Sequence, residues 1–378
     1  MDTTTNIVLI IAVALVLVGA LMFVISLAAA DWDFTKLDSG KYESRTYTLT
    51  ADFSDIFIES KVASVKFVPS SDSEVKVVCY EHKRANHAVS VNDGVLNVKV
   101  NNNLKWYDNI FSFGVPKITV YLPEGEFGSL VIGVDTGDVD VPNGFGFESV
   151  SIIGSTGDVD FCATVKNSLK IAISTGDIEI EGAKAGDVEL EVSTGDIEID
   201  GLECNSFKTK GSTGDVEIAK LSVKEEVYIE RSTASVEMEI TSARDLAVKT
   251  GTGDITLNYI TCSESLSTTA GTGYVKISNA TCKTFTSSGI TGDLVLANLV
   301  AEGSLSADRN TGDVILRSSD ASEIYITTDT GDVTGTLLSD KVYITHAATG
   351  DVDVPKSASG GKCEITTSTG DIKIEVVK

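Results

Sequence analysis

ISTGDIEIEG, residues 173–182, decides the fold, because the chain repeats this stretch many times. It returns as VSTGDIEIDG at residues 192–201, as GSTGDVEIAK at 211–220 and as TSTGDIKIEV at 367–376. The threonine of the TGD motif, or of a degenerate form of it, recurs every 19 or 20 residues from Thr136 to Thr369. A fixed period of this length is typical of a repeat architecture.

Each unit contains two short runs in which apolar and polar residues alternate, for example residues 169–173 and 177–180. Alternation with period 2 indicates strands with one buried face. Two short strands cannot bury that face alone, whereas copies stacked about 4.8 Å apart can do so. The sequence therefore predicts an all-β fold, a parallel β-solenoid of about 13 regular rungs. By analogy with most parallel crossovers we expect a right-handed coil.

Composition shifts along the chain predict five segments. They are a short N-terminal tail (1–6), a transmembrane helix (7–30), a juxtamembrane linker (31–45), degenerate β rungs that partly cap the coil (46–130) and the regular solenoid (131–378). No polar cap follows the final strand, IKIEVV at residues 372–377. An open edge there would favour end-to-end self-association.

The predicted transmembrane helix rests on 24 uncharged residues, 7–30. As a helix they would span about 36 Å, enough for a hydrocarbon core of about 30 Å. A cleaved signal peptide is the alternative, but no basic residue precedes the run. Lys36, Lys41 and Arg45 follow it, and the positive-inside rule would then place the large domain in the cytoplasm. Long domains translocate largely regardless of such a bias, so the charges alone leave the orientation open.

The glycine of each motif is interpreted as a structural turn residue. A coil must bend sharply at the same place in every rung, and glycine adopts positive φ without steric cost. The predicted corner glycines are Gly137, Gly157, Gly176, Gly195, Gly214, Gly253, Gly292, Gly312, Gly331, Gly350 and Gly370.

Acidic residues follow the corner and would stack in two columns on the outer face. Like charges about 4.8 Å apart repel by nearly 1 kcal/mol even in water, so something must offset the repulsion. The carboxylates could accept turn N–H groups, attract cations diffusely, or hold Ca²⁺. The first explanation is favoured, and no cofactor is expected. The candidate cation stripe comprises Asp138, Asp140, Asp158, Asp160, Asp177, Glu179, Asp196, Glu198, Asp215 and Glu217.

Nothing in the sequence indicates catalysis. It lacks a G-x-S-x-G elbow, a P-loop and a C-x-x-C pair. His82 and His87 lie in the polar stretch YEHKRANHAV and are expected to be solvated. Six cysteines are expected mainly as buried free thiols, although Cys262 and Cys282 lie on adjacent rungs where a disulfide is possible.

The net charge of −25 argues against nucleic acid as a partner and is compatible with cationic peptides. An acidic, well-solvated surface that resists aggregation is the simpler explanation for this charge.

Three further stretches accompany the TGD repeats: DFTKLDSGKYESRTYTL at residues 33–49, VKVVCYE at 75–81 and PKITVYLP at 116–123. With the apolar N-terminal run, they make the whole chain resemble the bacterial putative-adhesin β-strand-repeat family. That resemblance implies a membrane-anchored solenoid displayed outside a Gram-positive cell, of unknown function, with no enzyme activity.

On this basis we expect a single-pass protein of the cell membrane with an extracellular C-terminal domain. It would act as an adhesin, or as a module that senses an envelope ligand or stress, with a surface ligand, cationic peptide or envelope protein as partner. The alternatives are an intracellular, membrane-bound scaffold that polymerises, and a carbohydrate-active β-helix enzyme.

Overall fold

The computed structural model describes residues 3–29, 42–71, 74–82, 85–102 and 115–377. A helix, α1 (Thr3–Ala29), precedes the strands. Among the residues described in full, no helix is both long enough and apolar enough to cross a membrane. The helical part of the prediction for residues 7–30 therefore agrees with the structure, whereas the transmembrane part is not supported.

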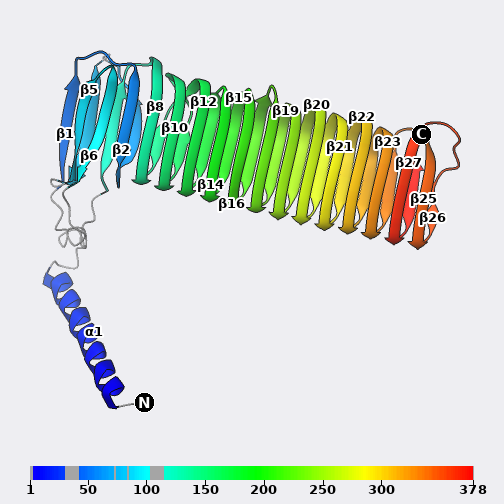
Figure 1. Ribbon diagram of the computed structural model, residues 1–378, viewed down its shortest axis with the longest axis horizontal. Coiled ribbons are helices and arrows are strands. Elements are labelled where there is room, and N and C mark those ends of the chain that lie inside the picture. The colour runs from blue at the N-terminus through cyan, green and yellow to red at the C-terminus, as the bar shows by residue number, and fades with distance from the viewer. Residues whose placement is uncertain (1–2, 30–41, 72–73, 83–84, 103–114, 378) are drawn as a thin grey trace.

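The remaining elements are strands that stack along one long solenoid (Figure 1). The N-terminal strands are β1 (Tyr42–Leu49), β2 (Asp55–Ser60), β3 (Ser64–Pro69), β4 (Val75–His82), β5 (Ala85–Asn92), β6 (Val95–Asn102) and β7 (Lys117–Leu122). The first regular rungs are β8 (Gly125–Thr136), β9 (Val139–Val141), β10 (Phe145–Thr156), β11 (Val159–Phe161), β12 (Thr164–Thr175), β13 (Ile178–Lys184), β14 (Asp187–Thr194), β15 (Ile197–Cys204), β16 (Ser206–Thr213), β17 (Val216–Val223) and β18 (Glu226–Thr233).

In the later rungs, one long bent strand replaces the separate strands. These are β19 (Val236–Thr252), β20 (Ile255–Thr272), β21 (Val275–Thr291), β22 (Leu294–Thr311) and β23 (Val314–Thr330). The chain then forms β24 (Val333–Leu337), β25 (Lys341–Thr349), β26 (Val352–Asp353), β27 (Gly361–Thr369) and β28 (Ile372–Val376).

All regular rungs pair in parallel and in register at the corner. Thr136 lies beside Thr156, Thr156 beside Thr175, and the same pairing continues to Thr311 and Thr330. The eleven predicted corner glycines have φ values between +118° and +153°, which L side chains rarely adopt. Stacking adds a second constraint, because a Cβ on Gly157 would collide with the carbonyl oxygen of Gly137. The parallel β-solenoid predicted from the repeat is confirmed.

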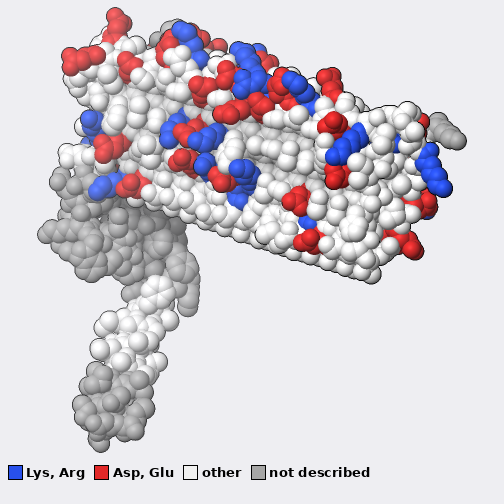
Figure 2. All heavy atoms as spheres, turned by 45° about the vertical axis from the view of Figure 1, so that its right-hand side comes forward, with Lys and Arg blue, Asp and Glu red and all other residues white. Residues whose placement is uncertain are grey.

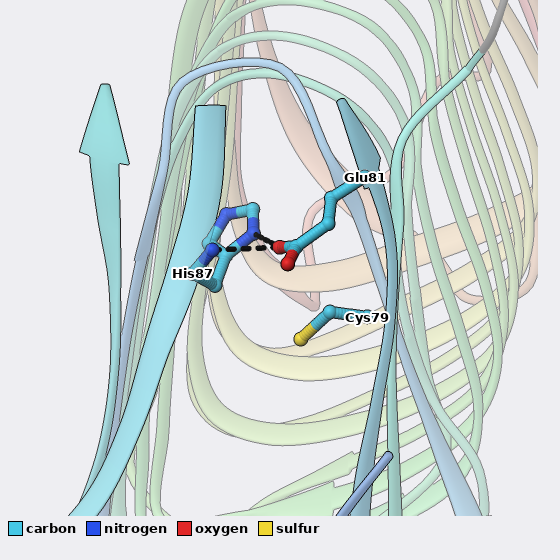
Figure 3. Close-up of side chains that lie close together, drawn as sticks. All are labelled: Cys79, Glu81 and His87. Carbon is cyan, nitrogen blue, oxygen red and sulfur yellow. Dashed lines mark hydrogen bonds and ion pairs between the residues drawn. The ribbon is translucent and has the colours of Figure 1, made fainter. Parts of the chain in front are cut away.

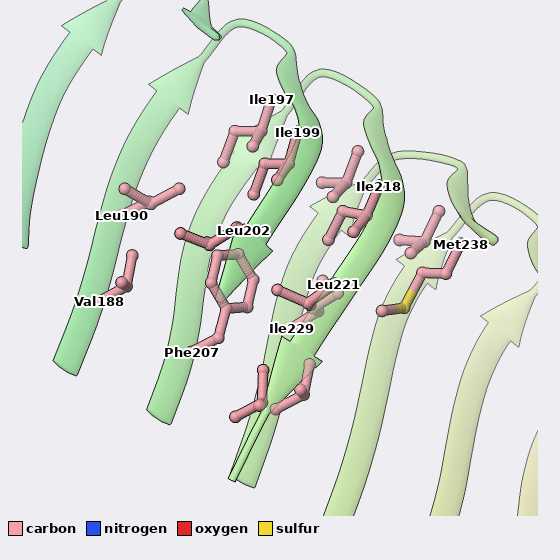
Figure 4. Close-up of a cluster of buried hydrophobic side chains, with 14 of the residues drawn as sticks. Val188, Leu190, Ile197, Ile199, Leu202, Phe207, Ile218, Leu221, Ile229 and Met238 are labelled. Carbon is pink, nitrogen blue, oxygen red and sulfur yellow. The ribbon is translucent and has the colours of Figure 1, made fainter. Parts of the chain in front are cut away.

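Alternating residues of each rung point inward and form one continuous core (Figure 4). Side chains such as Leu190, Ile199 and Ile218 are fully buried and stack on the equivalent side chains of the next rung. Near the N-terminal end, Phe67 packs edge to face against Phe145 and Phe147 within this core.

The N-terminal strands only partly follow the solenoid pattern. β2 and β3 stack in parallel on β8 and β9, as degenerate rungs should. β4 runs antiparallel to β1 and β7, and β5 runs antiparallel to β6. Segment 46–130 thus supplies two rungs and a cap of antiparallel strands. The order is also unexpected, because β2 lies between β8 and the later strand β6.

The rungs at the C-terminal end do not stack in chain order either. β27 lies between β23 and β25, so that Thr369 pairs with both Thr330 and Thr349. β28 lies in the same way between β24 and β26. The prediction that residues 372–377 form the open edge is therefore wrong. Both final copies keep the TGD motif, but β25 carries the apolar Val342 and Ile344 where β27 carries Lys362 and Glu364, and the loop at residues 354–360 lets the chain step back.

Candidate functional site

A groove with a volume of about 850 Å³ runs along the solenoid where strands approach the TGD corner. Its lining crosses several rungs, from Ile153 to Gly251. Because neighbouring rungs stack in register, each position along the groove repeats as a column. One outward column contains Glu191, Lys210, Glu230 and Lys249, and the other contains Ser174, Ser193, Ser212 and Ser232.

The charged column of the groove is ordered by ion pairs and by an aromatic ring. Lys210 Nζ lies 3.1 Å from Glu230 Oε2, and this contact, with the nearby Tyr228 hydroxyl, lowers the pKa of Glu230. Lys210 Nζ and Lys249 Nζ lie 5.7 and 5.2 Å from the centre of the Tyr228 ring. Figure 2 shows basic and acidic side chains interspersed in bands along the solenoid. The groove therefore offers fixed donors and acceptors to a long ligand.

Arg231 forms part of the groove floor, although its side chain points inward and is 2% exposed. Its Nη1 donates to the carbonyl oxygen of Val192 at 3.0 Å, while Nε and Nη2 have no hydrogen-bond partner. Burial lowers the pKa of Arg231. The sequence analysis missed this residue. The alternation Val227, Ile229, Arg231 could have placed it inside.

The predicted acidic columns exist and lie on the outer face. The backbone N–H of Asp158 donates to Asp138 Oδ1 at 3.2 Å, and those of Asp177 and Asp196 donate to the preceding aspartate at 2.9 and 2.8 Å. Asp215 continues the series at 2.7 Å, and Ser235 N donates to Asp215 Oδ1. Each carboxylate of the first column is therefore an acceptor for the rung above it.

The second acidic column lies two residues further on, where Asp140, Asp160, Glu179, Glu198 and Glu217 pair in register. Lys66 ends the column and binds Asp140 at 2.5 Å. Burial and the charges of Asp140, Asp158 and Asp138 raise the pKa of Asp160, and burial and Asp160 raise that of Glu179. Carboxylates from both columns line a hollow of about 260 Å³. Hydrogen bonds from the next rung thus offset the repulsion between the carboxylates of the first column, whereas the carboxylates of the second column still repel one another.

The prediction that His87 is solvated is wrong, because His87 is 4% exposed. His87 points inward from β5 toward Cys79 and Glu81 of β4 (Figure 3). His87 Nδ1 lies 2.8 Å from Glu81 Oε2, and His87 Nε2 lies 3.1 Å from Ser60 Oγ. The polar residues next to His87 in the sequence suggested an exposed position. The alternation Val77, Cys79, Glu81 in β4, in contrast, indicates a face that points inward.

The order Ser60, His87, Glu81 resembles a nucleophile, base and carboxylate. A hydrolytic serine must meet its substrate, yet Ser60 is 4% exposed and its Oγ faces the interior. The arrangement is therefore suited to holding the cap together and not to catalysis.

All six cysteines are free. Cys262 and Cys282 are buried, and burial raises the pKa of both thiols to about 12. The structure thus shows no disulfide between these adjacent rungs.

The chain has distant matches among solved structures. A putative adhesin from Bacteroides fragilis is 14% identical, with 89% of this chain and 98% of that chain covered and a TM-score of 0.25. A putative cell adhesion protein from Clostridium sporogenes is 10% identical over 52% of this chain and 99% of that chain, with a TM-score of 0.25. A putative lipid binding protein from Parabacteroides distasonis is 12% identical over 89% of this chain and 98% of that chain, with a TM-score of 0.24.

No curated protein matches the sequence. The family model described as Toastrack DUF4097, in contrast, matches residues 53–281 and 275–378. These matches cover both the N-terminal cap and the regular solenoid, and they confirm the expected kinship with a family of β-strand repeats. The chain belongs to the Toastrack DUF4097 family.

Proposed function

We propose that this chain is a non-catalytic binding protein of the cell envelope, which holds an extended ligand along its solenoid. The groove of about 850 Å³ carries the proposal. A small metabolite would need a closed cavity with a few convergent polar groups. This groove is instead open, long and periodic, and so it fits a polymer whose groups also repeat.

The proposed ligand is a linear polysaccharide that bears hydroxyl and carboxylate groups. Lys210 and Lys249 offer charged donors at intervals of two rungs, and the serine column offers hydroxyls at every rung between Ser174 and Ser232. Ionised partners make stronger hydrogen bonds than neutral ones, so the lysines should provide most of the affinity.

The envelope location is the part of the proposal that the sequence supports most directly. Residues 7–30 carry no charge, which is compatible with attachment of the N-terminal segment to a membrane. The family resemblance favours an outer location for the solenoid. Treating intact cells with a protease tests this placement. Loss of the solenoid before lysis is expected, and a solenoid untouched until lysis would reject it.

Binding of the full chain to immobilised polygalacturonate, with neutral dextran as a comparison, tests the ligand class. The double variant Lys210→Glu/Lys249→Glu should lose at least tenfold in affinity for polygalacturonate. Lys283→Glu is the matched control, because Lys283 is an exposed lysine paired with Glu264 outside the groove. Equal losses in both variants, or equal binding to dextran, would reject the groove as the site.

A second candidate function, self-association through the C-terminal end, is supported by β25. This strand pairs with β27 on one side and has no strand partner on the other among the described residues. Its outward Val342 and Ile344 are 38% and 52% exposed, and no charged residue lies between Lys341 and Asp351. Natural edge strands usually carry charges that prevent strand addition.

The occupant that we propose for this edge is β25 of a second copy. At the opposite end, β1 carries Glu43 and Arg45, so that end is protected in the usual way. Pairing of like ends would give a two-fold symmetric dimer, whereas a filament would need both ends to be receptive.

A further inference from the structure

Three chemically different side chains meet inside the N-terminal cap, and none of them lines the groove. Cys79 and Glu81 project inward from β4, and His87 projects toward them from β5 (Figure 3). One ligand atom from each residue lies within 4.8 Å of the other two. Their exposed fractions are 0%, 1% and 4%, so bulk water does not separate them.

The histidine of this cluster is held by its outer nitrogen. Its Nε2 lies 3.1 Å from Ser60 Oγ, which also accepts the backbone N–H of Ala63 at 3.2 Å. Metal-binding histidines characteristically use one ring nitrogen for such a bond, which directs the other toward the metal. Here the other nitrogen, Nδ1, faces Glu81 and Cys79.

The hydrogen-bonded pair of His87 and Glu81 leaves one carboxylate oxygen of Glu81 without a hydrogen-bond donor. Glu81 Oε2 accepts hydrogen bonds from the backbone N–H of His87 at 2.6 Å and contacts the ring at 2.8 Å. Glu81 Oε1 is buried and has no hydrogen-bond partner, and Arg45 Nη1 lies 3.7 Å away, beyond hydrogen-bond distance. The Arg45 guanidinium forms an ion pair with this oxygen but no hydrogen bond, and a buried carboxylate oxygen without a hydrogen-bond donor is costly, so the site can accept a further ligand there.

We propose that Cys79 Sγ, Glu81 Oε1 and His87 Nδ1 form a binding site for Zn²⁺ in the N-terminal cap. Thiolate, imidazole and carboxylate are the ligands that zinc uses, at distances of about 2.0–2.3 Å. Tetrahedral bonds of this length place ligand atoms about 3.5 Å apart, so ligand atoms that now lie within 4.8 Å of one another would move closer together around the ion. A hard cation such as Ca²⁺ would not select a thiolate.

The site would link two strand ladders of the cap, because its ligands come from β4 and from β5. These strands pair with each other at His82 and Ala85 and otherwise belong to different ladders. A bound ion would cross-link the ladders where the regular stacking of rungs is absent. The role assigned to zinc is thus structural, and it is independent of the proposed ligand groove.

Metal content of the full, untagged chain tests the site. After zinc loading and dialysis we expect about one Zn²⁺ per chain, and Co²⁺ should give a thiolate-to-metal charge-transfer band in the near ultraviolet. That band excludes ions held by the acidic columns, which contain no sulfur. A folded wild-type chain that retains no zinc and gives no such band would overturn the proposal.

Variants then identify the ligands. Cys79→Ser and His87→Gln should each remove the cobalt band and lower zinc retention at least tenfold. The matched control is Cys363→Ser, because Cys363 is an equally buried free thiol outside the cluster. An equal loss in Cys363→Ser would contradict the assignment. If Cys79→Ser fails to fold, the cobalt spectrum of the wild-type chain still shows whether a thiolate binds the metal.

Discussion

Arg231 crosses over Gly211 of the preceding rung, and its Nη1 donates to the carbonyl oxygen of Val192, two rungs away, at 3.0 Å. The pair recurs, because Arg309 lies beside Gly289 in the same register. In both cases a Cβ on the glycine would meet the guanidinium. A missing side chain in one rung thus makes room for a buried arginine in the next.

Gly211→Ala should destabilise the chain by about 2 kcal/mol, because the added methyl group overpacks a filled interior. It would collide with Arg231 Nη1 and with the carbonyl oxygen of Val192. Chemical denaturation measures the change. Gly133→Ala is the control, since a Cβ there meets nothing within 4 Å, and its effect should stay within about 0.5 kcal/mol. Equal effects of the two substitutions would refute this account.

The first acidic column predicts an order of stabilities at Asp196. Asp196→Ala removes the acceptor of the Asp215 N–H and should cost about 1 kcal/mol. Asp196→Asn keeps a carbonyl acceptor and removes one charge from a repulsive column, so it should be at least as stable as the wild type. Urea unfolding at neutral pH measures both. An alanine variant as stable as the wild type would show that these hydrogen bonds contribute nothing.

The second column predicts a pH dependence at Asp160. The folded chain raises the pKa of this carboxyl group, mainly by burial and then by the charges of Asp140 and Asp158. The folded state therefore binds the proton more tightly than the unfolded state does. This contribution to stability is present below the unfolded pKa of about 3.9 and is lost as pH rises through the folded pKa.

Asp160→Asn should accordingly be more stable than the wild type at pH 7, and the difference should shrink below pH 4. Unfolding curves at several pH values provide the measurement. Asp93→Asn, in the turn between β5 and β6, is the control, because it removes one carboxylate outside the acidic columns. A difference for Asp160→Asn that does not vary with pH would exclude the repulsion as its cause.

The free edge of β25 predicts a change in oligomeric state. Ile344→Lys should convert dimers into monomers in sedimentation velocity, because a charge on an exposed edge strand opposes pairing. Ile240→Lys is the matched control and should leave the dimer intact. Ile240 is 54% exposed, close to the 52% of Ile344, but it lies on β19 within the stack. A wild-type chain that stays monomeric at high concentration would reject the dimer.

The repeat alone predicts the regular part of the fold. A period of 19 or 20 residues places Thr136 to Thr330 in register, and alternation assigns the inward face of each rung. The order of the outer rungs could not be predicted in the same way. Residues 341–353 and 361–376 both keep the TGD motif and its period, so the repeat alone does not say which of them pairs with β23 and β24.

The buried polar residues could be predicted only in part. Arg231 and Glu81 stand at positions that alternation marks as inward, but their charge argues for the outside. The partners that make burial tolerable come from elsewhere, as when Ser60 lies 27 residues from His87. Such distant polar contacts leave no local signal in the sequence.

The displaced rung at the C-terminal end constrains the order of assembly. Most repeat arrays can grow unit by unit, since each copy docks on the one made before it. Here β25 and β26 emerge from the ribosome first but have nothing to dock on until β27 and β28 have covered β23 and β24. Thirteen residues, 341–353, must therefore wait for a segment translated after them, and this tip of the rod should be the last part to become resistant to proteases.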